Sequence, residues 1–419
     1  MCESYKIFFY LINGCKINRK IPLTIALLCI IQYFNQGISS LPQQSLYYLL
    51  REYWNLSASI IGLISWIVGL AWYLKIFAGY LIDNVSIKGK RTSYYLRGSY
   101  IGLLLVYLYI IFFGFNLISL IITGIIINLC ITFADVSVDR EMVIAECKYN
   151  LHGRLQSLQW TSLGIAGLIV ALGGAWIAKY FPEHINYKIA YGLSSLVPLG
   201  MLIYLIKGFK EKTVRKIKKI LFFQILKNNL KKINNKKLLL GLLFVTCLQF
   251  CPSFGTVLMI KIRENLHIDK MFLGYLGAMG TVLGVVGYIL YYKWAYKFPM
   301  KQLLYFMILF STITNLFYLY LPNKWILLVY NLAFGAFGGI TFMTLLAFFV
   351  KIIPIGSEAF FYALITSISN FASRGGNFIG GIIYDCSNYS ITVIVSSICT
   401  FLCIFFIPHL KIGETHINT

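Results

Sequence analysis

Three charged residues stand in apolar segments of the sequence. Lys75 lies inside such a segment, two helical turns before Asp83, whereas Asp135 and Asp139 come near the end of another. An unpaired lysine at the middle of a membrane helix costs about 2.5–3.5 kcal/mol, so we expect Lys75 either to pair with an acid or solute anion or to extend to the interface. Asp135 and Asp139 are four residues apart and therefore share one helical face. They can form a structural ion pair with Lys75, or bind a solute and relay protons.

A short hinge follows Lys75. It contains Gly79 and Asp83 at the end of one apolar segment, and then Gly89, Lys90 and Arg91 directly before the next. An acid, a glycine and basic residues between two membrane-length segments are the components of a gate, and we predict these five residues as the gating loop.

Polar residues interrupt the first apolar segment, among them Gln36, Gln43 and Gln44. A helix facing lipid would not carry them, so they line a solute path or form hydrogen bonds between helices. A second cation, Arg374, lies in the glycine-rich stretch Ser373–Gly381. Its planar guanidinium suits a carboxylate or a flat heterocycle.

The composition indicates an all-α polytopic membrane protein. Apolar residues make up 59% of the 419 positions, charged residues only 12%, and the mean hydropathy is +0.76. A soluble domain would have about 25% charged residues. The apolar runs predict twelve transmembrane helices, at 24–50, 59–82, 94–113, 117–139, 155–179, 188–206, 238–260, 271–292, 302–321, 325–350, 359–384 and 389–408.

The net charge of +23 follows the topology of these helices. With both termini on one side, that side carries 28 of the 37 Lys and Arg residues and the opposite loops carry 7. This asymmetry predicts that both termini are cytosolic, and it needs no nucleic-acid partner. The ten cysteines form no CxxC pair and the five histidines lie in loops or at the end of the chain. We therefore expect no metal, no cofactor and no enzyme activity, and no signal peptide is evident.

The twelve helices divide into two halves. The double glycines at 173–174 and 380–381 occupy matching positions in two sets of six spans, which favours a parallel internal repeat. The predicted boundaries are 1–206 for the N-terminal six-helix bundle, 207–237 for a basic amphipathic linker on the cytosolic leaflet, and 238–419 for the C-terminal six-helix bundle.

The hinge from Gly79 to Arg91 resembles the loop between helices 2 and 3 of the major facilitator superfamily. The surrounding motifs resemble more specifically those of the folate-biopterin transporter family. They are Pro42 to Leu49, the Trp72-x-x-Lys75 pair before the hinge, Asp135-Val-x-Val-Asp139, Leu155-Gln156-Ser157-x-x-Trp160, and Arg374 to Gly381. Family members often have prolines beside the helix 2 Trp and Lys, where this chain has Ala71 and Ile76.

The resemblance implies two six-helix bundles around a central cavity, working by alternating access on folates and pterins with coupled proton movement. Residues implied to bind the solute are Gln36, Gln43, Gln44, Trp72, Lys75, Asp135, Asp139, Gln156, Trp160 and Arg374. Another charged organic solute, such as S-adenosylmethionine, and a nutrient sensor on a transporter scaffold remain alternatives. The expected location is the plasma membrane, with an organellar membrane as the alternative.

Overall fold

The computed structural model describes residues 23–149, 154–209, 211, 236–353 and 358–410. In these ranges every extended regular element is a helix, and the predicted all-α class is confirmed. The predicted linker at 207–237 lies for the most part outside the described residues. By their contacts, the described residues form two compact units. The first lies within Met1–Leu49 and Val68–Phe222, and the second within Leu50–Ile67 and Phe223–Thr419. The contacts thus group Leu50–Ile67 with the second half of the chain.

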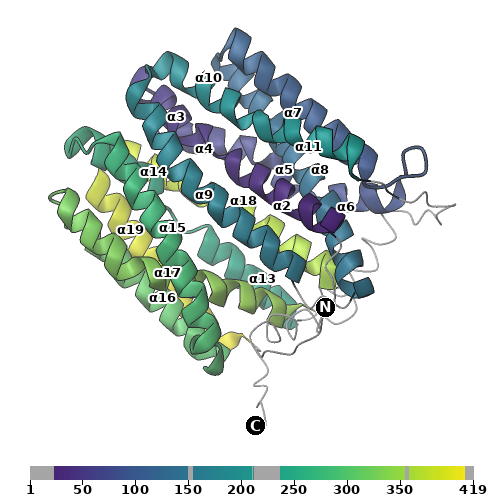
Figure 1. Ribbon diagram of the computed structural model, residues 1–419. Helices are drawn as coiled ribbons and strands as arrows, with labels where there is room; N and C mark the ends of the chain where they lie inside the picture. The colour runs from purple at the N-terminus through teal and green to yellow at the C-terminus, as the bar shows by residue number, and fades with distance from the viewer. Residues whose placement is uncertain (1–22, 150–153, 210, 212–235, 354–357, 411–419) are drawn as a thin grey trace. The chain divides into compact units, whose positions relative to one another are not determined.

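The first unit contains the helices drawn from purple to teal in Figure 1, apart from α4 (Ala58–Val68). Gly37 lets two of them approach closely, because a Cβ atom there would lie only 2.4 Å from the Cβ of Ala166. Pro42 occupies the first turn of a helix, where its missing N–H has no helical partner to lose. The helices are α2 (Leu23–Ile38), α3 (Pro42–Tyr48), α5 (Leu70–Tyr73), α6 (Lys75–Asn84), α7 (Ser93–Phe113), α8 (Leu117–Tyr149), α9 (Arg154–Tyr180), α10 (Glu183–Ser194) and α11 (Leu196–Lys207).

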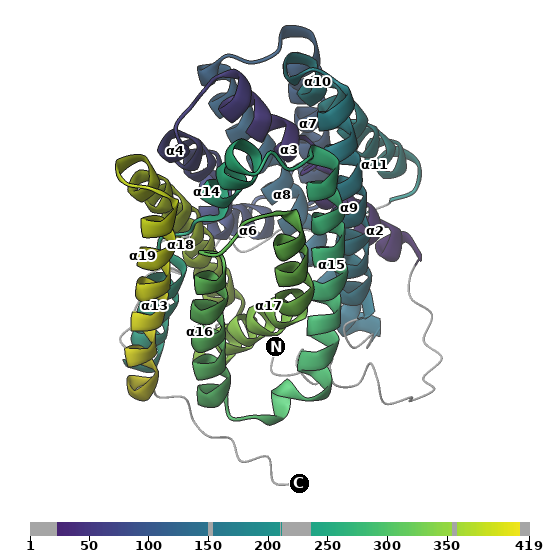
Figure 2. The same ribbon diagram turned by 90° about the vertical axis from the view of Figure 1, so that its left-hand side faces the viewer.

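The second unit begins with a π-helical turn, η1 (Leu49–Tyr53), and α4 (Ala58–Val68), each of which has one terminal residue in the first unit. It continues with α13 (Lys236–Gln249), α14 (Gly255–Ile260), η2 (Lys261–Asn265), α15 (Lys270–Lys293), η3 (Ala295–Lys297), α16 (Met300–Phe317), α17 (Lys324–Ile352), α18 (Glu358–Cys386), α19 (Tyr389–Leu402) and η4 (Cys403–His409). Helices α16 and α19 pack against each other, and α15 contacts α17 (Figure 2).

Glycines set the closest helix contacts of this unit. A Cβ atom on Gly287 of α15 would lie 2.0 Å from the carbonyl oxygen of Ala336 in α17. One on Gly380 of α18 would lie 1.8 Å from the carbonyl oxygen of Ser253, in the interruption between α13 and α14. Ser253 N–H also donates to the Gly376 carbonyl at 2.9 Å. The glycine-rich stretch of α18 is therefore explained by close backbone packing.

Nine helical segments of the described ranges are long and apolar enough to cross a membrane, and they match nine of the predicted spans. The other three predicted spans are also helical. The span at 59–82 is divided into α4, α5 and α6, that at 238–260 into α13 and α14, and that at 359–384 is the continuous but more polar α18. Helix α8 continues to Tyr149, ten residues past the predicted end of its span.

Candidate functional site

A break in the second predicted span positions Lys75. Helix α5 ends at Tyr73 and α6 begins at Lys75, while Leu74 between them has φ −98° and ψ 14°. Irregular backbone at membrane depth is tolerated only where protein or a cavity surrounds it. Lys75 is therefore the first residue of a new helix, directly after an interruption that we expect protein or a cavity, rather than lipid, to surround.

Lys75 is paired with the acids of α8. Its Nζ lies 2.5 Å from Oδ2 of Asp135 and 3.8 Å from Oδ2 of Asp139. The Asp135 side chain is only 3% exposed, whereas those of Lys75 and Asp139 are 27% and 30% exposed. The one-turn spacing of the two acids lets both face the same ammonium. One positive charge thus faces two carboxylates, and the Asp139 carboxylate is the more exposed of the two.

Two further helices contribute neutral partners to Asp139. Tyr33 of α2 donates its hydroxyl to Oδ1 at 2.9 Å, and Gln159 of α9 donates Nε2 to the same oxygen at 3.3 Å. Trp160 follows Gln159, and its ring meets that of Tyr33 edge-on at 6.4 Å between centroids. Asp139 therefore connects α2, α8 and α9.

Trp72 of α5 also lies near the lysine. Its Nε1 donates to Oδ1 of Asn128 at 2.8 Å, which fixes the indole against α8. The Lys75 ammonium is 5.7 Å from the centre of the Trp72 ring, within the range of a cation–π interaction. The spacing of Trp72 and Lys75, one turn apart, thus places both at the same cluster.

Several buried amide atoms of the first unit have no hydrogen-bond partner among the described residues. They are Gln32 Nε2, Asn35 Nδ2, Gln36 Oε1 and Gln159 Oε1. The other amide atom of Gln32, Oε1, accepts from the Tyr100 hydroxyl. Because buried polar atoms are nearly always satisfied, these four need water or a polar solute as a partner. Gln36 was predicted from the sequence, whereas Gln159 was missed.

The remaining predicted binding residues do not contact this cluster directly. Gln43 and Gln156 are exposed, and Gln44 donates Nε2 to the Tyr48 hydroxyl at 3.0 Å. Arg374 belongs to the second unit, where its Nη1 donates to the Ser65 carbonyl at 3.0 Å. The glutamine of α9 that contacts an acid is Gln159 rather than Gln156. The roles of Gln43, Gln44, Gln156 and Arg374 stay predictions.

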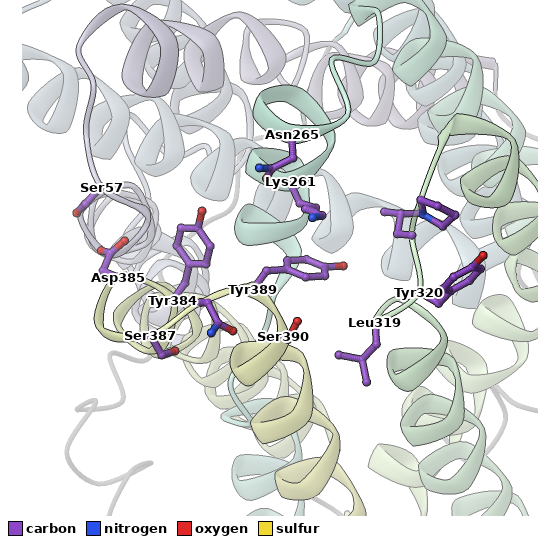
Figure 3. A pocket seen from close by; sticks show the side chains of 13 residues that line it. Ser57, Lys261, Asn265, Leu319, Tyr320, Tyr384, Asp385, Ser387, Tyr389 and Ser390 are labelled. Atoms are coloured by element: carbon purple, nitrogen blue, oxygen red, sulfur yellow. The ribbon is translucent and has the colours of Figure 1, made fainter.

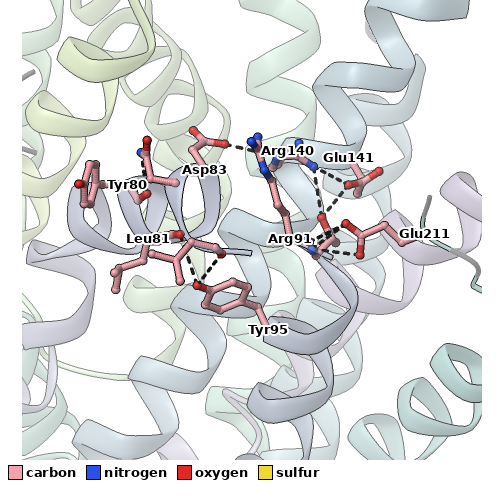
Figure 4. Close-up of polar contacts among 11 residues, drawn as sticks. Tyr80, Leu81, Asp83, Arg91, Tyr95, Arg140, Glu141 and Glu211 are labelled. Atoms are coloured by element: carbon pink, nitrogen blue, oxygen red, sulfur yellow. Dashed lines mark hydrogen bonds and ion pairs between the residues drawn. The ribbon is translucent and has the colours of Figure 1, made fainter. Parts of the chain in front are cut away.

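Asp83 of the predicted gating loop contacts α8. Its Oδ1 lies 3.4 Å from Nε of Arg140, and Arg140 Nη1 lies 2.8 Å from Glu141 Oε1 (Figure 4). Glu141 also accepts the Thr92 hydroxyl at 2.6 Å. This chain of contacts ties the end of α6, the start of α7 and α8 together. Gly79 is not required by close packing, since a Cβ there would meet Val136 at an ordinary 3.8 Å.

Gly89, Lys90 and Arg91 act here through their backbone. Lys88 and Gly89 both have positive φ, 49° and 74°, and Ile87 and Lys90 exchange two backbone hydrogen bonds across them. This is the geometry of a tight turn for which glycine is suited. The N–H groups of Arg91, Thr92 and Ser93 donate to the carboxylate of Glu211. Glu211 thus caps the start of α7 from a distant part of the chain, and the sequence pattern does not reveal it.

A second charged cluster lies in the other unit. Arg51 of η1 binds Glu264 of η2 through two bonds, Nε–Oε1 at 2.6 Å and Nη2–Oε2 at 3.1 Å. Arg263 of η2 binds Glu52 of η1 through the same atoms at 2.9 and 3.4 Å. Each arginine pairs with the glutamate that follows the other arginine. We call these two ion pairs the reciprocal pairs.

The segments that carry the reciprocal pairs are two copies of one local structure. In each, arginine Nη1 donates to the carbonyl five residues later, in Leu56 or Ile268. A positive φ occurs at Asn55 and at His267, and a π-helical turn contains each Arg-Glu. Such turns are rare and are often found at functional sites. The sequence signal, a repeated hydrophobic-Arg-Glu after the first and seventh spans, was available but was interpreted only as loop charge.

Comparison with known proteins agrees with this architecture. The sequence pattern of the BT1 family matches residues 36–415. The "Folate-biopterin transporter" of Synechocystis sp. is 24% identical over 92% of this chain and 81% of its own length. "Folate transporter 1" of Plasmodium falciparum is 21% identical over 89% of this chain and 76% of its own. A crystal structure of a mutant of the nucleoside transporter NupG has a TM-score of 0.71 at 11% identity, covering 94% of this chain and 100% of that one. The fold is that of the major facilitator superfamily, and the chain belongs to the BT1 family.

Proposed function

We propose that this chain is a secondary active transporter of folate- and pterin-type solutes. The observation that carries the proposal is the Lys75–Asp135–Asp139 cluster, together with unpartnered buried amides on α2 and α9, the helices whose Tyr33 and Gln159 contact Asp139. A folate offers carboxylates for an ammonium, and its pterin edge offers donors and acceptors for amides and carboxylates. The names of the two relatives support the same solute class.

The charge balance of the cluster supports proton coupling. One ammonium faces two carboxylates, so one negative charge is left for a proton or for another cation. We propose that a proton enters with the solute and occupies this carboxylate pair. Asp135→Asn is then expected to lose accumulation driven by a pH gradient and to keep solute exchange. A variant with unchanged pH dependence would contradict the coupling.

The same surplus negative charge favours a second candidate, a cationic organic solute such as S-adenosylmethionine. Uptake by purified protein in liposomes separates the two, with labelled folic acid, pteroate, biopterin and S-adenosylmethionine supplied at two pH values. Folate uptake that falls in Lys75→Gln but not in Lys179→Gln, a matched loss of charge in the same unit, supports the folate proposal. Failure of folic acid, pteroate and biopterin to drive or inhibit uptake contradicts it. Ligand binding without any uptake would instead indicate a sensor.

Alternating access is supported by the two charged clusters. We propose that the Asp83–Arg140–Glu141 contacts brace the hinge between α6 and α7 on the predicted cytosolic side. The reciprocal pairs hold Leu50–Ile67 to η2 on the opposite side, so they must break when that side opens. Asp83→Asn is accordingly expected to change turnover more than binding, and Lys75→Gln the reverse.

A further inference from the structure

A cavity of about 880 Å³ lies in the second unit, at the ends of its helices next to η2. Its walls come from η2, from the connection between α16 and α17, and from the connection between α18 and α19 (Figure 3). Its volume is within the roughly 300–1,000 Å³ of small-molecule sites. It contains none of the residues assigned above to the solute site in the first unit.

Lys261 gives the cavity a positive charge. Its ammonium lies 5.7 Å from the centre of the Tyr389 ring, and it has no carboxylate within ion-pair distance among the described residues. The neighbouring Arg263 on η2 is already paired with Glu52, a carboxylate that Lys270 also approaches at 3.7 Å. Lys261 is therefore the cation of this wall whose charge remains available to a ligand.

Asp385, the one acidic residue of the described lining, forms hydrogen bonds with backbone N–H groups. Asp385 accepts the backbone N–H groups of Ala58 and Ser59 at 3.2 and 2.9 Å, and so caps the start of α4. Burial raises the pKa of this carboxyl, but hydrogen bonds from Ser59, Ser57 and Ala58 outweigh that effect and hold its pKa below the ordinary value. The negative charge of Asp385 thus interacts with the N-terminus of α4, and it does not form an ion pair with Lys261.

Tyrosine rings complete the walls. Tyr384 and Tyr389 stand on either side of the α18–α19 connection, and Tyr320 belongs to the α16–α17 connection. The Tyr389 hydroxyl donates to the Tyr318 carbonyl at 2.9 Å, which fixes its ring below the Lys261 ammonium. Phenol rings offer flat apolar faces with a polar edge, and these suit an aromatic ring that carries polar substituents.

We propose that this cavity binds an organic anion with an aromatic ring, its carboxylate on Lys261 and its ring against the tyrosines. The choice of folate-like anions as the ligands rests on the proposed function. The site is a second one, carried by the second unit alone. Because Lys261 and Asn265 are the end residues of η2, an occupant of the cavity contacts the same turn that carries Arg263 and Glu264 of the reciprocal pairs.

Cys386 provides a native reporter for the test. It is an exposed free thiol between Asp385 and Ser387, which both line the cavity. The full-length protein in nanodiscs is treated with a polar maleimide, and modification of the Cys386 peptide is followed by mass spectrometry. The probes are folic acid and p-aminobenzoylglutamate. At a probe concentration about ten times its Kd, mass action leaves about a tenth of the sites free, so labelling should slow about tenfold.

The protection should persist in Lys75→Gln and in Lys324→Gln, which removes a charge near the start of α17 outside the cavity lining. It should disappear in Lys261→Gln. Protection that survives Lys261→Gln, or no protection of the wild type by either probe, overturns the proposal. Uptake of folic acid by the same purified protein reconstituted in liposomes shows whether the proposed function falls with it. Uptake that is sensitive to Lys75→Gln, without Cys386 protection in nanodiscs, removes only the second site.

Discussion

Exchanging the charges of one reciprocal pair tests whether these contacts hold one side of the protein closed. The pair joins Arg51 to Glu264 by two bonds at 2.6 and 3.1 Å, with side chains that are 20% and 43% exposed. Exposed ion pairs contribute about 0.2–1 kcal/mol, and two-bond arginine geometry places this one near the upper end. A loss of about 1 kcal/mol changes an equilibrium constant about fivefold.

Glu264→Gln should therefore raise the population open on that side about fivefold. If the open state is the minor one, the apparent KM for solute supplied from that side falls by the same factor, because only the open state binds. Removing both pairs, with Glu52→Gln added, should lower it about 30-fold if the two contributions add. The assay is uptake into vesicles of defined orientation, with folding checked by gel filtration of the solubilised protein.

The exchange provides the decisive control. Arg51→Glu alone places two acids together and should open that side further, whereas Arg51→Glu combined with Glu264→Arg restores the attraction and should return KM toward that of the wild type. Lys324→Gln removes a charge outside the reciprocal pairs and should leave KM unchanged. An unaltered KM in Glu264→Gln, or a double variant no closer to wild type than its parents, would refute the role of the reciprocal pairs.

Three further predictions concern single contacts. Gln159→Leu removes a hydrogen bond to the Asp139 carboxylate, so it should destabilise the protein by about 1.5 kcal/mol in thermal unfolding in detergent. The control Gln156→Leu, at an exposed position, should change stability by no more than about 0.5 kcal/mol. Equal losses would contradict the contact between Gln159 and Asp139. Glu211→Gln should destabilise the start of α7 by about 1 kcal/mol. The backbone N–H groups of Arg91, Thr92 and Ser93, which donate to Glu211, should then exchange their hydrogens faster. Unchanged exchange would count against the cap. Folding lowers the pKa of Asp385, so the stability that its charge contributes is present above the unfolded value of about 3.9 and is lost as pH falls through the folded value. The melting temperature of Asp385→Asn should therefore fall less than that of the wild type between pH 5 and pH 3. Parallel melting curves would contradict this.

The pairing of Lys75 with an acid was accessible to sequence reasoning because the cost of an unpaired charge inside a membrane is large. The four-residue spacing of Asp135 and Asp139 then identified the partners. The rotation of α9 about its axis was not accessible, because Gln156 and Gln159 lie one turn apart and only packing against α8 shows which one reaches Asp139. The break at Leu74 has neither a proline nor a glycine at the residue itself to signal it.

Long-range polar contacts were beyond the sequence for a related reason. Glu211 is an ordinary acid beside a basic stretch until the fold brings it to the start of α7. Arg51 and Arg263 each look like a loop charge at the end of a span, and counting charges assigns them to a side without assigning a partner. Their pairing depends on two segments from different halves of the sequence meeting, which local periodicity does not encode.

The reciprocal pairs follow the rule of a contact between identical subunits, in which residue i of one copy meets residue j of the other and the converse also holds. Here both copies belong to one polypeptide. A half-length protein with a single Arg-Glu turn would present the same donor and acceptor to a second molecule of itself and would form both ion pairs as a twofold homodimer. The duplicated turn thus gives a single chain the reciprocal contact of a twofold dimer, with the same arginine and glutamate atoms paired in both directions.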